Sequence, residues 1–289
     1  MRCRTERRTA PTLVQALALG ALHGPAELLP ISSSGHVTAI PWLLGCDDAD
    51  PDGPDGPDGR AHSDPELRKA FEVALHAGTA AALLITLRAE VSQAARNLSG
   101  RRAGLILLSF APPAVVGYAL ERQIERRTGT PATVAAGLIC GSLAMALADR
   151  AAQTRAADEA GVADALWLGV AQTCALIPGV SRNGATLAAA RARRFTREDA
   201  NRLSRYAALP VIGGATALMG VRLARRGLPR AAAAPFAAGA AASFASTLAC
   251  TWLIGQVERD RSLLPYACYR VALAGLIVRR LRRLRTARF

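Results

Sequence analysis

Residues 104–120 read GLILLSFAPPAVVGYAL, without a single charged side chain. Uncharged, largely apolar runs recur at residues 131–148, 206–221 and 231–254. The hydrocarbon core of a bilayer is ~30 Å thick, and a helix needs roughly 20 residues to cross it. These runs reach or approach that length, and a soluble domain would not repeat them so often. The sequence therefore predicts an all-α integral membrane protein.

The charged residues are mostly arginines placed between the apolar runs. The chain of 289 residues has 36 Lys and Arg against 22 Asp and Glu, a formal net charge of +14, and Lys69 is its only lysine. Segments such as ERQIERRTG (121–129) and RARRFTRED (191–199) lie where basic side chains meet anionic headgroups and orient helices. No nucleic-acid-binding module accompanies this charge. The sequence indicates the bilayer, and no nucleic acid, as the partner of the basic segments.

Two polar stretches interrupt the apolar pattern. AELLPISSSGHV (26–37) breaks the segment 12–45, and ALIPGVSRNGAT (175–186) breaks the segment 164–190. Irregular backbone at membrane depth is tolerated only where protein buries it or where it lines a wet cavity. We therefore expect each segment to form a re-entrant helix pair, and about six full transmembrane helices to accompany the two pairs.

The two broken segments are related by a shift of 149 residues. This shift pairs Gly20 with Gly169, His23 with Gln172, Ser32 with Ser181 and Gly35 with Gly184. Paired broken segments in the two halves of a chain are typical of an inverted-topology repeat. We predict one membrane domain over 1–289, with repeat halves at roughly 10–150 and 160–285. Residues 46–66 carry three Pro-Asp-Gly repeats and predict a flexible acidic loop.

The first break combines a carboxylate, hydroxyls and an imidazole. Glu27 lies four residues after His23, so a helix would place both on one side. A carboxylate within the membrane costs roughly 2.5–3.5 kcal/mol, so Glu27 should have a partner: Arg182, His36 or a divalent cation. The hydroxyls of Ser32, Ser33 and Ser34 suit phosphate oxygens, although a serine here can equally cap a helix. The imidazole of His36 can act as base, acid or nucleophile.

The second break supplies the cation. Arg182 can hold a phosphate through two parallel hydrogen bonds, and Ser181 and Asn183 add polar contacts beside it. Alternatively, Arg182 could have a purely structural role, pairing with Glu27 to hold the two halves of the chain together. It could also be a loop arginine at the level of the lipid headgroups. Together, however, the two breaks predict a site for an anionic phosphate in or at the membrane. No Walker motif is present, so nucleotide hydrolysis is not indicated.

GALHGPAELLPISSSGH and ALIPGVSRNGAT resemble the two signatures of the undecaprenyl-diphosphate phosphatases, the bacitracin-resistance family of bacterial cell-wall metabolism. The resemblance extends to FEVALHAGTAAALLI and YAALPVIGGATAL, and so covers nearly the whole chain. It implies an enzyme that hydrolyses undecaprenyl diphosphate to undecaprenyl phosphate and inorganic phosphate. It also implies a divalent cation, Mg²⁺ or Ca²⁺, and a multi-pass protein of the bacterial plasma membrane with its active site facing outside.

The resemblance also implies roles for individual residues. Glu27 would bind the metal or act as base, and Ser33 would be the nucleophile or a phosphate ligand. His36 would be an acid, a base or an alternative nucleophile, while Ser181 and Arg182 would clamp the diphosphate. The sequence departs from the family pattern at His23, where a glutamate or glutamine is usual. A single glutamate supplies few of the oxygen ligands that a hard cation prefers, so His23 is a further candidate ligand.

A transporter or flippase for polyprenyl phosphates is the alternative, because paired broken helices also build carriers. A carrier needs the phosphate grip of Arg182 but no nucleophile or base, so the Glu27–Ser33–His36 group favours the enzyme. The arginine-rich termini favour the cytoplasm by the positive-inside rule, against the outside orientation that the resemblance implies. A homodimer is left open by the sequence.

Overall fold

The computed structural model describes residues 11–45, 65–259 and 262–286 of the chain. Most of the acidic loop predicted at 46–66 lies outside the described residues. Its last two residues, Pro65 and Glu66, already belong to a helix.

The described structure is helical and contains no strand, apart from an isolated bridge between Arg155 and Phe195. The first half holds α1 (Leu13–Leu28), α2 (Ser33–Leu44), α3 (Pro65–Thr86), α4 (Arg88–Arg96), α5 (Gly100–Thr128) and α6 (Pro131–Ala148). The second half holds α7 (Val162–Cys174), α8 (Arg182–Ala192), α9 (Arg197–Arg226), α10 (Arg230–Ala249), α11 (Trp252–Arg259) and α12 (Leu264–Thr286). A short 3₁₀ turn, Ala157–Glu159, lies between them.

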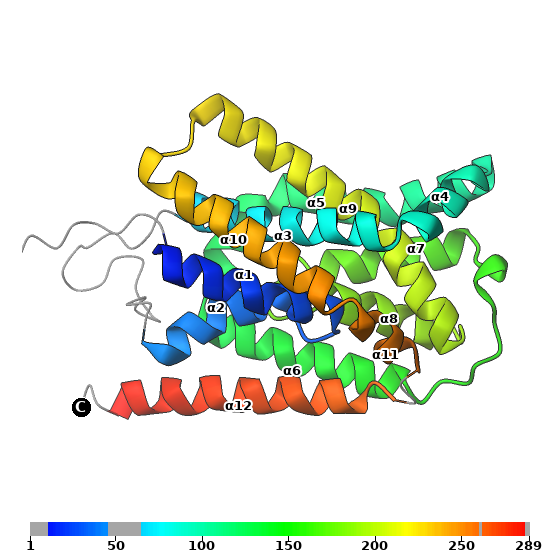
Figure 1. Cartoon of the computed structure of the whole chain (residues 1–289). Coiled ribbons are helices and arrows are strands. Elements are labelled where there is room, and N and C mark those ends of the chain that lie inside the picture. Colours follow the sequence, from blue (N-terminus) through cyan, green and yellow to red (C-terminus); the bar gives the residue numbers. More distant parts are fainter. Residues whose placement is uncertain (1–10, 46–64, 260–261, 287–289) are drawn as a thin grey trace, which may run out of the picture.

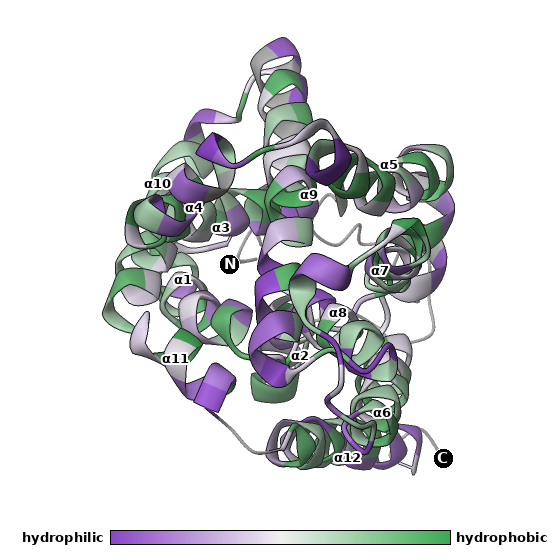
Figure 2. Cartoon of the chain, turned by 90° about the vertical axis from the view of Figure 1, so that its right-hand side faces the viewer, coloured by the Kyte–Doolittle hydropathy of each residue, from purple (hydrophilic) through white to green (hydrophobic). Residues whose placement is uncertain are grey.

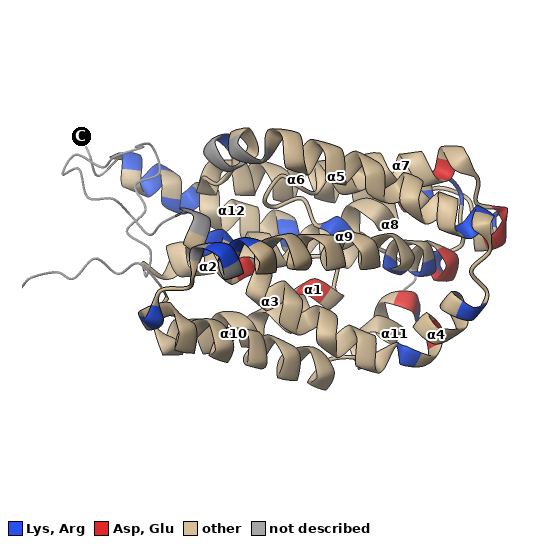
Figure 3. Ribbon diagram, turned by 90° about the horizontal axis from the view of Figure 1, so that it is seen from above, with Lys and Arg blue, Asp and Glu red and all other residues tan. Residues whose placement is uncertain are grey.

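Three described helices are long and apolar enough to cross a bilayer: residues 100–120 of α5, all of α6 and all of α10. The bent pair α11–α12 makes a fourth if it is counted as one span. Large apolar side chains of α5 and α6 point outward, since Leu107 and Val115 of α5 are 63% and 66% exposed and Leu143 of α6 is 59% exposed. Figure 2 shows hydrophobic residues along the peripheral helices such as α5 and α7, and Figure 3 shows most of the charged residues gathered at the two ends of the bundle. This arrangement fits an integral membrane protein with three to four such spans, and the figure of about six stays a prediction.

The broken segments form two helix hairpins. In Figure 1, α1 and α2 form a hairpin that begins and ends at the end of the bundle where α12 ends. The hairpin of α7 and α8 opens at the opposite end. There Arg193, directly after α8, donates from Nε to Asp164 Oδ1 at 2.7 Å, in the first turn of α7. The turns of both hairpins therefore point toward the middle of the bundle.

Helices from the two halves pack on each other reciprocally. The first-half helix α1 lies against α10, while α7 of the second half lies against α5, and α6 lies beside α12. Helices α1 and α10 approach closely at Gly20. Any larger residue there would clash, because its Cβ would meet the carbonyl oxygen of Gly239. Small residues at helix interfaces allow such approach in membrane proteins.

Asp149, directly after α6, fastens three helices at one end of the bundle. Its carboxylate accepts hydrogen bonds from Ser262 Oγ (2.7 Å), the Leu263 amide (2.9 Å) and Arg197 Nη2 (2.6 Å). Burial raises the pKa of this carboxyl, but the hydrogen bonds and the Arg197 charge outweigh burial and hold the pKa below its ordinary value. Asp149 therefore stays charged and joins the end of α6 to the starts of α9 and α12.

Candidate active site

The first break is shaped by a serine in an unusual backbone conformation. Helix α1 ends at Leu28, and Ser32 adopts a left-handed backbone with φ of 78°. The Ser32 hydroxyl accepts a hydrogen bond from the Gly35 amide at 3.2 Å, so α2 starts at Ser33. Such a cap satisfies one of the free amides at a helix N-terminus. The break thus ends with a helix N-terminus in the middle of the bundle.

The second break ends in the same kind of cap. Ser181 accepts a hydrogen bond from the Gly184 amide at 3.1 Å, and α8 starts at Arg182. Gly179 has a φ of +93°, and a Cβ there would clash with the carbonyl oxygen of Val134. Glycine is needed at this position because it alone combines a positive φ with so close an approach.

The two breaks meet at Glu27. Ser33 Oγ donates to Glu27 Oε2 at 2.5 Å, and Arg182 Nη2 donates to Glu27 Oε1. Asn183 adds a hydrogen bond from Nδ2 to the carbonyl oxygen of Leu28 at 3.2 Å. Glu27 and Ser33 are buried, while the Arg182 side chain stays 19% exposed. The structure therefore brings the predicted carboxylate, hydroxyl and guanidinium together from both halves of the chain.

This site suits an anion. Helices α2 and α8 both begin here, at Ser33 and Arg182. The N-terminus of a helix carries partial positive charge and amides that bind phosphate oxygens. Arg182 has further N–H groups beyond the one that contacts Glu27. A phosphate between the two helix starts would meet a cation, free amides and the Ser33 hydroxyl.

His36 lies apart from this group. Its Nδ1 donates to the Ser32 carbonyl at 2.7 Å, and its Nε2 accepts from the Tyr269 hydroxyl at 2.8 Å. The ring stacks on Tyr269 with centroids 5.6 Å apart. No hydrogen bond joins His36 to Ser33 or Glu27 in the described structure. The imidazole predicted to act beside Ser33 is therefore directed toward α12.

The other predicted phosphate-binding residues hold the breaks in shape. Ser32 and Ser181 are the helix caps, and Ser34 Oγ lies 3.5 Å from Ser32 Oγ. Asn183 also accepts from Ser204 Oγ at 3.1 Å, so both ends of its side-chain amide are engaged. In these contacts the side chains hold the backbone of the two breaks in place. Their direct contact with phosphate stays a prediction.

Sequence reasoning identified His23 as a candidate metal ligand beside Glu27 but missed His76. His76 Nε2 lies 3.5 Å from Glu27 Oε2, and the rings of His76 and His23 stand edge to face with centroids 4.5 Å apart. Ligand atoms of His23, Glu27 and His76 all lie within 4.8 Å of one another, which makes them a group that could hold a metal ion. The signal was an imidazole inside the apolar run FEVALHAGTAAALLI.

Arg270 of α12 was also missed. It is fully buried, and Nη1 donates to the carbonyl oxygen of Pro30 at 3.2 Å while Nη2 donates to that of Gly179 at 3.0 Å. One guanidinium thus holds a backbone oxygen from each break. The signal was a single arginine within an otherwise apolar segment, residues 264–278, where a charge without partners would be costly.

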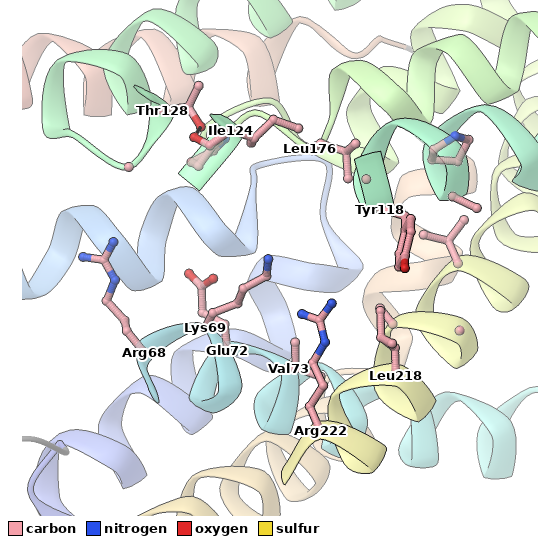
Figure 4. A pocket seen from close by; sticks show the side chains of 18 of the residues that line it. Arg68, Lys69, Glu72, Val73, Tyr118, Ile124, Thr128, Leu176, Leu218 and Arg222 are labelled. Atoms are coloured by element: carbon pink, nitrogen blue, oxygen red, sulfur yellow. Dashed lines mark hydrogen bonds between the residues drawn. The ribbon is translucent and has the colours of Figure 1, made fainter. Parts of the chain in front are cut away.

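Two cavities adjoin the site. Glu27 and Arg182 line a small one of about 70 Å³. A larger cavity of about 450 Å³ is lined in part by Glu72. The backbone carbonyl of Glu72 accepts a hydrogen bond from His76 Nδ1 at 2.8 Å. This cavity therefore lies about one turn of α3 from the Glu27 group. Figure 4 shows its two kinds of wall, with Arg68, Lys69, Glu72 and Arg222 on one side and Ile124, Leu176 and Tyr118 across from them.

The sequence profile of a family described as Bacitracin resistance protein BacA matches residues 16–276. The chain belongs to the BacA family. Similar proteins include an undecaprenyl-diphosphatase of Geobacter sulfurreducens, 35% identical over 279 residues that cover 92% of this chain and 97% of that protein. An undecaprenyl-diphosphatase of Rubrobacter xylanophilus is 34% identical over 280 residues, which cover 92% and 97% of the two chains. The resemblance seen in the two signatures is therefore confirmed for the BacA family over most of the chain.

Proposed function

We propose that this protein is an integral-membrane phosphatase that hydrolyses undecaprenyl diphosphate to undecaprenyl phosphate and inorganic phosphate, recycling the cell-wall carrier lipid. The similar proteins of the BacA family bear the name undecaprenyl-diphosphatase. The observation that carries the proposal within this chain is the contact of a serine hydroxyl with a buried carboxylate, Ser33 Oγ to Glu27 Oε2 at 2.5 Å. A base beside a hydroxyl is what activates a nucleophile.

Ser33 is the proposed nucleophile. Its Oγ attacks the terminal phosphorus, a P–O bond to serine forms, and the bond from that phosphorus to the bridging oxygen breaks. The serine proton passes to Glu27, which delivers it to the departing lipid phosphate. In the second step Glu27 takes a proton from water as the water attacks the phosphoserine, and Ser33 Oγ regains a proton as inorganic phosphate leaves.

Arg182 balances the charge that gathers on the phosphoryl oxygens. Preorganised cations and amides aimed at developing charge supply much of the rate enhancement in phosphoryl transfer. The starts of α2 and α8 add their amides. His36, in contact with Ser32 and Tyr269, would position the start of α2 and would reach the phosphate only after its ring turns.

The Mg²⁺ or Ca²⁺ that the resemblance implies fits these residues poorly. Such hard cations prefer shells of oxygen ligands. The group at Glu27 offers one carboxylate and two imidazoles, from His23 and His76. The steps above therefore use only the side chains of this chain.

The larger cavity is the proposed place for the part of the lipid next to the diphosphate. Its wall of Ile124, Leu176 and Tyr118 suits isoprene units, and its cationic wall with Arg68 and Arg222 suits phosphate oxygens. The cavity of about 450 Å³ is far smaller than a C55 chain requires, so the rest of the tail would lie in the bilayer.

The proposed topology has two re-entrant hairpins, α1–α2 and α7–α8, that enter the membrane from opposite sides. Their opposite openings and the reciprocal packing of α1 on α10 and α7 on α5 support an inverted repeat with halves at roughly 10–150 and 160–285. We place the single domain in the bacterial plasma membrane, with the active site facing outside. A homodimer stays a prediction.

Phosphate release from a C55 diphosphate by the purified protein in detergent tests the proposal. Wild-type protein should release phosphate, while Ser33→Ala and Arg182→Ala should not. Ser142→Ala is the matched control, because this buried serine of α6 only donates to the Leu138 carbonyl in its own helix. A folded wild-type protein that binds the lipid but releases no phosphate would overturn the enzyme and leave the transporter or flippase, which no observation here favours.

A further inference from the structure

The histidines beside Glu27 are arranged as metal ligands. His76 Nδ1 lies 2.8 Å from the carbonyl oxygen of Glu72. A carbonyl only accepts, so the proton of the neutral ring sits on Nδ1 and the lone pair on Nε2. That lone pair is directed at the Glu27 group, with Nε2 at 3.5 Å from Oε2. Histidines that bind metals usually donate their other N–H to a backbone carbonyl or a carboxylate in this way.

His23 has a matching arrangement. Its Nδ1 contacts two hydroxyls, Thr79 Oγ1 at 3.0 Å and Ser243 Oγ at 3.3 Å. Its Nε2 is buried and finds no hydrogen-bond partner among the described residues. An unsatisfied polar atom in the protein interior is energetically costly, so such an atom needs an explanation. Ser243 Oγ donates its proton to the Leu75 carbonyl oxygen at 2.9 Å and so accepts from Nδ1, which leaves the lone pair on Nε2 for a metal ion.

The spacing fits one small ion. The three ligand atoms lie within 4.8 Å of one another, and the His76–Glu27 pair at 3.5 Å is already close to final spacing. Ligands of a tetrahedral zinc ion at ~2.0–2.1 Å lie roughly 3.3 Å apart, so small side-chain rotations close the site. Glu27 Oε2 can keep its hydrogen bond from Ser33, since a carboxylate oxygen has two lone pairs.

We propose that His23, Glu27 and His76 bind a divalent transition metal of the zinc type in preference to Mg²⁺ or Ca²⁺. Imidazole nitrogens suit zinc and its neighbours, whereas Mg²⁺ and Ca²⁺ take oxygen ligands. Two imidazoles and one carboxylate from the protein leave a position open for a further ligand. The proposal rests on this donor set and not on the phosphatase reaction.

Metal binding without lipid tests the proposal separately from the phosphatase. The full-length protein is purified in detergent and stripped with a chelator, and Zn²⁺, Co²⁺ and Mg²⁺ are titrated in turn. Zn²⁺ should bind at least ~100-fold more tightly than Mg²⁺. Co²⁺ should give the intense visible absorption of a low-coordinate site with nitrogen ligands. Equal affinity for Zn²⁺ and Mg²⁺ would overturn the proposal.

Histidine variants locate the ion. His76→Gln and His23→Gln should each weaken Zn²⁺ binding by ~10²-fold or more and reduce the Co²⁺ absorption. The chain has 4 histidines, and His62→Gln is the control that should leave Zn²⁺ affinity within about threefold of wild type. His76 is 29% exposed, so its substitution should preserve folding even where that of buried His23 does not. Equal loss in a control would mean an adventitious ion and would overturn the site.

Discussion

The two breaks share a backbone device but carry different chemistry. In each, a serine side chain caps the next helix through the amide three residues on, Ser32 to Gly35 at 3.2 Å and Ser181 to Gly184 at 3.1 Å. The residue after the cap is Ser33 in one half and Arg182 in the other. The same frame therefore presents a proposed nucleophile from one side and a cation from the other, and neither half holds a complete site.

The difference extends to the helices that lead into the breaks. Glu27 corresponds to Leu176 at the 149-residue shift, so only the first half brings a carboxylate. His23 corresponds to Gln172, whose Nε2 donates to the Ser109 carbonyl at 3.0 Å. Gln172 joins two helices, whereas His23 belongs to the Glu27 group, and its Nε2 is buried without a hydrogen-bond partner among the described residues. In the proposed inverted repeat, the two halves thus pack in similar ways while only the first half carries the carboxylate and the histidines.

The largest expected effect separates Ser33 from Ser181. Ser33→Ala removes the proposed nucleophile and should lower phosphate release by roughly 10³-fold or more. Ser181→Ala removes a helix cap and should lower the free energy of unfolding by about 1 kcal/mol, with a much smaller loss of activity. Initial rates and thermal unfolding of both variants measure the contrast. Similar phosphate-release rates for the two variants would mean that Ser33 is not the nucleophile.

The pair that joins the halves should give the next largest effect. Arg182→Met leaves the buried Glu27 carboxylate without its cation and should destabilise the protein by about 3–5 kcal/mol. The double variant Glu27→Gln with Arg182→Met should recover part of that stability but no activity. A double-mutant cycle of unfolding midpoints and phosphate-release rates measures both terms. Recovery of activity in the double variant would show that the pair is purely structural.

Arg270 donates hydrogen bonds to the backbone of both breaks, so its substitution should disturb the two breaks equally. Arg270→Met removes the donors to Pro30 and Gly179 and should lower stability by about 2–4 kcal/mol, since hydrogen bonds to charged groups contribute ~1.5–3 kcal/mol each. Arg270→Lys keeps the charge and should retain part of the stability. Thermal unfolding in detergent tests this, and unchanged unfolding of Arg270→Met would contradict the bridging role.

The smallest effect compares the starts of the two hairpins. Gln15 and Asp164 correspond at the 149-residue shift, and each accepts from the backbone amide three residues before it, Thr12 and Gly161. Asp164 also pairs with two arginines, Arg155 at 2.8 Å and Arg193 at 2.7 Å. Asp164→Asn should therefore lower stability by about 1–2 kcal/mol, and Gln15→Ala by ~1 kcal/mol or less. Unfolding midpoints of both variants decide whether the ion pairs contribute.

Much of the site could be predicted from the local sequence. Serines and glycines between apolar runs indicate a break at any membrane depth, because the backbone there needs polar partners. A carboxylate in one break and an arginine in the other predict an ion pair, and the structure contains it in Glu27 and Arg182. His76 and Arg270 could not be assigned to the site, because each lies in an apolar run and meets its partners only through packing between helices.

The sequence by itself determined the class of protein, the two breaks and their residue types, because hydrophobicity, proline, glycine and serine act over a few neighbouring residues. Only the tertiary structure decided which polar groups meet. It turned His36 toward Tyr269, joined His23 and His76 at Glu27, and set Arg270 beneath both breaks. Those contacts join residues up to 240 positions apart, as in Arg270 with Pro30, and depend on helix packing that no local pattern encodes.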